Sequence, residues 1–348
     1  MAEDAKTAAT EADLRLVSTS PHIHSGASVR RVMLDVILAL TPAMVASALF
    51  FGWNALRLTG ACVASCLATE VACRKLMKRD AGVGDLSAIV TGILLAFNLP
   101  PALPTWMAVL GSIVAIAVAK QIFGGLGYNP FNPALVGRAA LLVSFPVAMT
   151  TWSAWHVPSP LAPDLVADAV TTATPLGLLK TTLSSGAGLP YAFDGATAWS
   201  FFLGLKNGCI GEVSGVALVL GAVYLLARRC VTWHVPVAYI GTVLVFSSIL
   251  WLARPQTAMN PAFHLLSGGL LLGAFFMATD MVTSPITRSG MLVFGAGCGL
   301  LTMLIRTWGG YPEGVSFAIL LMNAFTPLIN RATRPRVFGR KRGTAQKA

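Results

Sequence analysis

Long apolar stretches alternate with short polar or basic ones along most of the 348-residue chain. A helix that crosses a bilayer needs about 20 mostly apolar residues. Ten stretches reach or approach that length, and each is predicted to be a membrane span. They lie at about 32–53, 57–77, 86–99, 103–123, 133–150, 209–227, 235–253, 263–279, 290–307 and 314–330. The pattern therefore predicts an all-α, polytopic membrane protein.

The polar segments divide the chain into five predicted parts. Residues 1–31 form an N-terminal arm, and residues 32–150 contain the first five spans. Residues 151–208 form a loop region rich in Ser, Thr, Pro and Gly. Residues 209–330 contain the last five spans, and residues 331–348 form a basic tail.

Composition and charge support a membrane protein and set its orientation. Only 11% of the residues are charged, whereas soluble domains contain about 25%. If both termini are cytosolic, all but five of the 25 Lys and Arg residues lie on the cytosolic side, as membrane proteins prefer. The exceptions are Arg57, Lys180, Lys206, Arg254 and Arg306. This bias places residues 151–208 outside the cytosol and argues against nucleic-acid binding. The basic tail is suited to anionic lipid or to a cytosolic partner protein, and the sequence does not decide between them.

The chain lacks the motifs of a self-sufficient redox enzyme. Its six cysteines include no CxxC pair and no Cys/His set with metal-ligand spacing. No dinucleotide-binding glycine motif follows a predicted strand. We therefore expect no metal site, and no oxidation of ferredoxin or NADH by this chain alone.

Polar side chains inside predicted spans are costly and often mark a function. Asparagine followed by proline also interrupts a helix and frees main-chain carbonyls. One interpretation is an ion or flavin path; the other is that the asparagines cap broken helices, that the glutamate is interfacial and that Asp280 pairs with Arg288. The candidates are Asn98, Asn132, Asn260, Asp280 and Glu212.

The two halves of the chain share two short, weak sequence similarities. Residues 132–134 and 260–262 are both Asn-Pro-Ala, and residues 91–97 resemble residues 269–275. The latter pair lies in the third and eighth predicted spans, which run in opposite directions. This arrangement predicts two inverted five-helix repeats, whose broken helices meet near the membrane midplane.

A polar stretch in the predicted extracytoplasmic region carries a candidate modification site. Asp168, Thr171, Ala173 and Thr174 resemble the motif Asp-x-x-Ser/Thr-Gly-Ala-Thr, which a flavin transferase modifies. Thr172 stands where the motif usually has Gly. The resemblance implies that Thr174 carries FMN through a phosphoester bond.

The residues after this motif predict a turn. Pro175 and Gly177 favour a bend, which we expect to present the Thr174 hydroxyl to solvent. Because a hydroxyl is a poor nucleophile without activation, an external transferase is needed.

Three further stretches, 124–134, 260–280 and 307–325, widen the resemblance to about residues 20–340. Together they resemble the family that contains the D subunit of the Rnf electron-transport complex and the B subunit of the sodium-pumping NADH:quinone reductase. The short N-terminal arm favours the Rnf member. The resemblance implies ten helices in two inverted halves, similar to urea and ammonium channels.

The resemblance also implies a function. A complex in the bacterial inner membrane would move electrons between reduced ferredoxin and NAD while translocating Na⁺ or H⁺, with the A, B, C, E and G subunits of Rnf as partners. It leaves open whether a second, non-covalent flavin binds between the repeats. The alternative from another class is a urea- or ammonium-type channel without redox chemistry, which has no use for an FMN acceptor.

Overall fold

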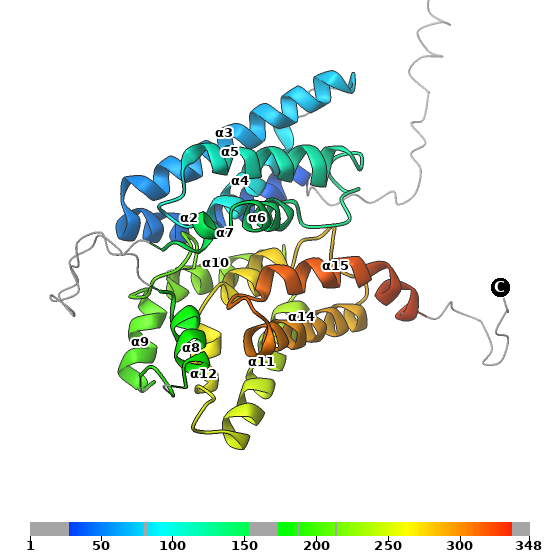
Figure 1. Cartoon of the computed structure of the whole chain (residues 1–348). Helices are drawn as coiled ribbons and strands as arrows, with labels where there is room; N and C mark the ends of the chain where they lie inside the picture. Colours follow the sequence, from blue (N-terminus) through cyan, green and yellow to red (C-terminus); the bar gives the residue numbers. More distant parts are fainter. Residues whose placement is uncertain are drawn as a thin grey trace, which may run out of the picture.

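The computed structural model describes six stretches of the chain, and all regular secondary structure in them is helical (Figure 1). This confirms the predicted all-α class. The described stretches are residues 28–79, 83–152, 173–186, 188–191, 193–212 and 214–335.

In the described stretches, five helices are long and apolar enough to cross a membrane, which supports a multi-pass membrane protein. Each coincides with a predicted span. They are α2 (Val29–Phe51), α3 (Trp53–Leu76), α11 (His234–Ala253), α14 (Arg288–Trp308) and α15 (Val315–Ala332).

The other predicted spans contain shorter apolar helices. A 3₁₀ turn, η1 (Val83–Asp85), precedes α4 (Ser87–Phe97), and α5 (Thr105–Ile113) continues into the π-helical segment η2 (Val114–Gln121). The remaining two are α6 (Pro133–Ser144) and α10 (Gly215–Ala227). Ten membrane crossings therefore remain a prediction.

Two predicted spans are interrupted, and another begins later than predicted. The fifth ends at Ser144, and α7 (Pro146–Thr150) follows it, because proline cannot donate a helical hydrogen bond. The sixth begins at Gly215 rather than at residue 209.

The eighth predicted span breaks in its middle. It consists of α12 (Pro261–Leu266), α13 (Leu270–Leu272) and the π-helical η4 (Gly273–Met277). At the break Gly268 has φ of 65°, in the left-handed region that favours glycine. The break exposes main-chain carbonyls inside the protein, where side chains must satisfy them.

Packing partners recur in the two halves of the chain. In the first half α3 packs on α4 and α5, and η2 packs on α6. In the second half α11 packs on α12 and α14, and α14 packs on α15. The halves meet where α2 packs on α10 and α6 packs on α15. Figure 1 shows α3, α4, α5 and α6 on one side of this interface and α11, α14 and α15 on the other.

Helices α11 and α14 approach closely because α14 carries small residues at the contact. A Cβ atom on Gly295 would lie 2.6 Å from the Val235 carbonyl oxygen, and one on Gly299 would lie 2.7 Å from that of Tyr239. Small residues spaced by four allow membrane helices to pack backbone to backbone. The Tyr239 hydroxyl also lies 2.7 Å from Thr302 Oγ1.

One buried carboxylate in the first half is fully paired. Glu70 on α3 accepts hydrogen bonds from Lys120 Nζ at 3.0 Å, Gln121 Nε2 at 2.9 Å and Arg74 Nη2 at 3.0 Å. Lys120 also donates to Ser87 Oγ at 2.6 Å. This network holds α3, α4 and η2 together.

The predicted loop region contains two helices in its described part, α8 (Pro175–Ser184) and α9 (Gly195–Leu203). They pack with α12 (Figure 1) around a separate apolar cluster. Its buried members are Leu176, Leu179, Phe201, Met259 and Phe263. The described part of region 151–208 is therefore more than a loop, and it is joined to the second half.

Candidate functional site

Thr174 is the N-cap residue of α8. Its Oγ1 accepts a hydrogen bond from Gly177 N at 3.1 Å, and Pro175 occupies the first helical position, where its missing N–H costs nothing. Thr174 is only 5% exposed. The prediction that its hydroxyl faces solvent is therefore wrong, because the residue is buried and its hydroxyl caps α8.

Of the other predicted motif residues, only Ala173 lies among the described residues. Ala173 is exposed beside Thr174. Asp168 and Thr171 lie outside the described residues, so their prediction as transferase-recognition residues stays a prediction.

Helix α8 is anchored to the segment between α14 and α15. Lys180 Nζ donates to the main-chain oxygens of Gly309 and Tyr311, the latter at 3.2 Å. Partial burial lowers the pKa of Lys180. A Cβ atom on Gly268 would lie 2.8 Å from Leu176 Cδ1 and 3.1 Å from Arg306 Nη2. The N-terminal turn of α8 thus lies close to the break between α12 and α13.

A cluster of buried charges lies at the interface between the halves. Arg138 on α6 donates from Nη1 to Asn98 Oδ1 at 2.8 Å, and its Nη2 contacts Glu313 Oε2. Its Nη1 lies 4.0 Å from Glu212 Oε1, and its Nη2 lies 3.8 Å from Cys209 Sγ. All five residues are buried. Arg138 therefore brings together residues from four separate segments.

The C-terminal end of α4 positions Cys209 and Glu212. Helix α4 ends before a Pro-Pro pair, which leaves carbonyls without helical partners. Gly211 N donates to Phe97 O at 2.9 Å, Ile210 N donates to Leu99 O at 3.1 Å, and Cys209 Sγ donates to Asn98 O at 3.4 Å. A Cβ atom on Gly211 would overlap that of Phe97, so glycine is required for this approach.

Two more buried cations donate hydrogen bonds to main-chain oxygens at the break in the eighth span. Lys206 Nζ donates to Leu266 O, and burial lowers the pKa of Lys206 to about 8. Arg306 donates from Nη1 to His264 O at 2.6 Å and from Nη2 to Ser267 O at 3.0 Å. Both cations thus bind main-chain carbonyls rather than a carboxylate.

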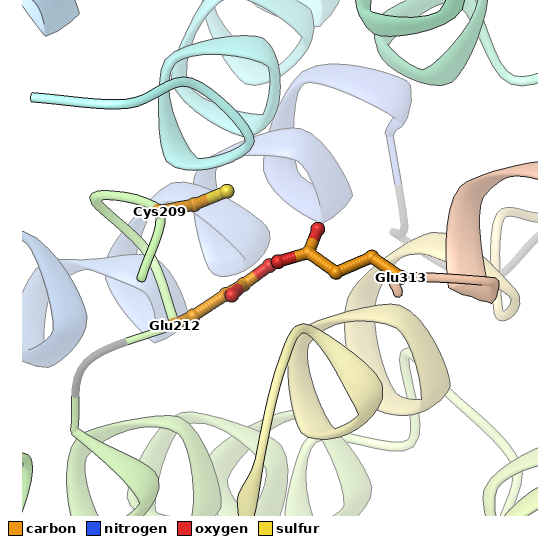
Figure 2. A group of neighbouring side chains, drawn as sticks. All are labelled: Cys209, Glu212 and Glu313. Atoms are coloured by element: carbon orange, nitrogen blue, oxygen red, sulfur yellow. The ribbon is translucent and has the colours of Figure 1, made fainter. Parts of the chain in front are cut away.

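Several atoms in this cluster lack a hydrogen-bond partner in the described part of the chain. Buried polar atoms are nearly always paired, with protein or with ordered water. The unpaired atoms are Glu212 Oε1, Glu313 Oε1, Arg138 Nε, Arg306 Nε and His264 Nδ1. Cys209 Sγ and the carboxylates of Glu212 and Glu313 also lie within 4.8 Å of one another (Figure 2). The positively charged guanidinium of Arg138 lies beside these groups and would repel a metal cation.

The asparagines fulfil the structural role that was predicted as one alternative. Asn132 Oδ1 caps α6 by accepting from Ala134 N at 3.1 Å, and Asn260 Oδ1 caps α12 by accepting from Ala262 N at 2.9 Å. Asn132 also donates to Met277 O at 3.3 Å, and Asn98 donates to Met277 Sδ at 3.6 Å. Asn98 and Asn132 therefore link the halves.

The five path candidates fall into three places. Asn98 and Glu212 belong to the Arg138 cluster, so Glu212 is buried rather than interfacial. Asn132 and Asp280 line one cavity of about 110 Å³ between the halves. Asn260 contributes to neither.

The alternative in which Asp280 pairs with Arg288 is not found among the described ion pairs. Asp280 instead accepts from Val282 N at 3.3 Å and from Thr283 Oγ1 at 3.2 Å, and the ion pairs among the described residues do not include it. It caps the turn that follows η4.

Five members of the cluster were not among the predicted site residues. A charge in or beside an apolar stretch was the available signal for four of them. Their grouping depends on contacts between residues as much as 175 positions apart. The missed residues are Arg138, Lys206, Cys209, Arg306 and Glu313.

Comparison with known proteins places the chain in a family. The model of the NQR2, RnfD, RnfE family matches residues 16–339. The chain belongs to this family. The resemblance found in the sequence is therefore confirmed.

Curated relatives cover nearly the whole chain. It is 47% identical to the D subunit of the proton-translocating ferredoxin:NAD(+) oxidoreductase complex of Clostridium ljungdahlii, over 94% of this chain and 96% of the relative. It is 46% identical to the D subunit of the Na(+)-translocating ferredoxin:NAD(+) oxidoreductase complex of Acetobacterium woodii, over 93% and 95%. It is 39% identical to the D subunit of the ion-translocating oxidoreductase complex of Escherichia coli, over 94% and 99%.

Proposed function

We propose that this chain is the D subunit of an Rnf-type complex that moves electrons between ferredoxin and NAD⁺ and translocates an ion. The observation that carries the proposal is the match to D subunits over nearly their full length. The A, B, C, E and G subunits are its proposed partners in the bacterial inner membrane. Because relatives are named for both H⁺ and Na⁺, the proposal covers either ion.

We further propose that Thr174 carries FMN as a phosphoester. The N-terminus of a helix favours a phosphate, because its first N–H groups and its dipole face the anion. Thr174 occupies that position on the ten-residue helix α8. Its esterified oxygen can still accept from Gly177 N, so the residues present fit the group. When bound, FMN would supply electron transfer.

Burial of Thr174 has a consequence for its modification. The flavin transferase must reach a hydroxyl that is 5% exposed once α8 is packed. We therefore expect attachment before α8 packs on the segment between α14 and α15. This order predicts poor modification of the folded, unmodified chain by added transferase.

The test of the flavin proposal is the intact mass of the chain from a host with an active transferase. We expect a mass increase of one FMN moiety, its loss in Thr174→Ala and its retention in Thr174→Ser, which keeps the hydroxyl. Thr182→Ala, on the same helix, is the matched control and should keep the increase. No increase in the parent chain would refute covalent FMN and favour the channel-type alternative.

The recurring packing partners support a fold of two inverted five-helix repeats, which we propose for the membrane part. Contacts of α3 with α4 and α5 correspond to contacts of α11 with α12 and α14. The similarity between residues 91–97 and 269–275 falls on α4 and on the broken eighth span, as this symmetry requires. The Asn-Pro-Ala similarity does not, because α6 and α12 occupy non-equivalent positions. A second, non-covalent flavin and an ion path through this chain stay predictions.

A further inference from the structure

Glu212 and Glu313 form an unusual pair of buried carboxylates. They are 2% and 3% exposed, and each has one oxygen without a hydrogen-bond partner among the described residues. Figure 2 shows their carboxyl groups pointing toward one another from two segments far apart in sequence. Ionised carboxylates have no hydrogen to share. Each carboxylate therefore has one oxygen without a donor, and an oxygen of one lies within 4.8 Å of an oxygen of the other.

The surrounding cations neutralise only part of this charge by direct contact. Among the described residues, Arg138 is the only cation within 4.0 Å of either carboxylate, and it contacts Glu313 more closely than Glu212. Lys206 and Arg306 face the pair but direct their N–H groups at main-chain oxygens. The other titratable groups facing it are Cys209 and Tyr311.

Burial makes a second ionised carboxylate costly. Each unpaired ion in a protein interior costs several kcal/mol, and a neighbouring like charge disfavours ionisation further. One guanidinium in contact neutralises one carboxylate. Lys206 and Arg306 add positive charge nearby but donate to main-chain oxygens, so one oxygen of each carboxylate stays without a donor among the described residues. A proton on one carboxyl group supplies such a donor.

We propose that Glu212 and Glu313 are a proton-binding site that holds one proton between their two carboxyl groups. The proton comes from hydronium, whose O–H bond breaks to leave water, and it forms an O–H bond on one carboxylate. The other carboxylate can then accept a hydrogen bond from that O–H group. Arg138 already occupies the position beside both carboxylates where a metal ion would need further ligands, whereas a proton binds to a single oxygen. We therefore expect the site to take H⁺ rather than Na⁺.

The place of this site suggests its use. A Cβ atom on Gly268 would lie 2.8 Å from Leu176 Cδ1, near the N-cap of α8, 3.1 Å from Arg306 Nη2 and 4.0 Å from Glu313 Cγ. An electron held near Thr174 would add negative charge beside the pair and increase its proton affinity. This redox linkage rests on the proposed flavin, whereas the proton site itself does not.

Infrared spectroscopy of the full-length chain tests the proton site without the flavin. In a Thr174→Ala background at neutral pH, we expect a carbonyl stretch of a protonated carboxylic acid that shifts in D₂O. Both Glu212→Gln and Glu313→Gln should remove this component, because the two residues share one proton. Glu70→Gln is the matched control and should leave it, because Glu70 is a buried carboxylate with three donors.

Each outcome decides between named possibilities. A component that survives both Glu212→Gln and Glu313→Gln overturns the shared site. Loss of the component on adding Na⁺, but not on adding K⁺, overturns the preference for H⁺ and assigns a sodium site. If Glu212→Gln does not fold, Glu212→Asp keeps the carboxyl group and should shift the component; an unshifted component overturns the proposal.

The flavin-bearing complex tests the linkage. Chemical reduction should increase the same infrared component in the parent complex and leave Glu212→Gln unchanged. If the mass measurement shows no FMN, the linkage fails while the flavin-free result still decides the proton site. If FMN is present and reduction does not change the component, the linkage is wrong.

Discussion

Arg138 is the residue on which the buried cluster depends. It donates to Asn98 and contacts Glu313, and these residues have no closer cation among the described ones. Arg138→Met would leave a buried carboxylate without its guanidinium, which costs about 3–5 kcal/mol. We expect a clear fall in the thermal unfolding midpoint of the detergent-purified chain.

Two companion variants separate charge from geometry. Arg138→Lys keeps the charge but cannot reach two partners in the same planar arrangement, so its midpoint should fall between those of the parent and Arg138→Met. Arg254→Met removes an exposed arginine and should change little. Equal midpoints for Arg138→Met and Arg254→Met would contradict the central role of Arg138.

At this scale the sequence predicts individual residues better than their contacts. Glu212 is identifiable because a charge beside an apolar run is expensive, and Asn132 and Asn260 because each precedes a proline. The cluster itself is not predictable, because Arg138 and Glu313 are 175 positions apart. The exposure of Thr174 was predicted wrongly, because turn residues identify a bend but not the side on which it packs.

The contact of α11 with α14 is the element-scale feature most open to test. Gly295→Ala would place a methyl group 2.6 Å from the Val235 carbonyl oxygen, so the two backbones must separate. Overpacking of this kind costs about 1–3 kcal/mol. We expect a lower unfolding midpoint for the purified chain.

Gly241→Ala, on α11, is the matched control. No atom lies within 4 Å of the added methyl group, and alanine favours helix over glycine by about 1 kcal/mol. Its midpoint should equal or exceed that of the parent. Gly295→Ala with a midpoint as high as that of Gly241→Ala would show that the helices are not in backbone contact.

Element positions follow from the sequence to a large extent, and element continuity does not. Every predicted span contains helix, because a long apolar run in a membrane has few alternatives. The break at residues 267–269 and the late start of α10 depend on tertiary hydrogen bonds. At the break, Arg306 and Lys206 donate hydrogen bonds to main-chain oxygens. Before α10, the main chain of the preceding segment donates hydrogen bonds to carbonyls at the end of α4.

For the whole molecule, the apolar pattern and helix length give different information. The apolar stretches predict ten crossings, whereas only five of the described helices are long enough to cross by themselves. The two views differ over the spans with shorter helices, one of which is the 11-residue α4. If α4 and the turn after it cross the membrane, residues before and after α4 lie on opposite sides.

Cysteine labelling decides between these topologies. Lys75 and Ala102 are exposed positions before and after α4. In a parent chain whose own labelling sets the background, we expect an impermeant maleimide to modify Ala102→Cys in intact spheroplasts. It should modify Lys75→Cys only after the membrane is permeabilised, because basic residues after α3 favour the cytosol. Labelling of both variants from one side would mean that α4 does not cross, and the ten-span topology with its two inverted repeats would then be wrong.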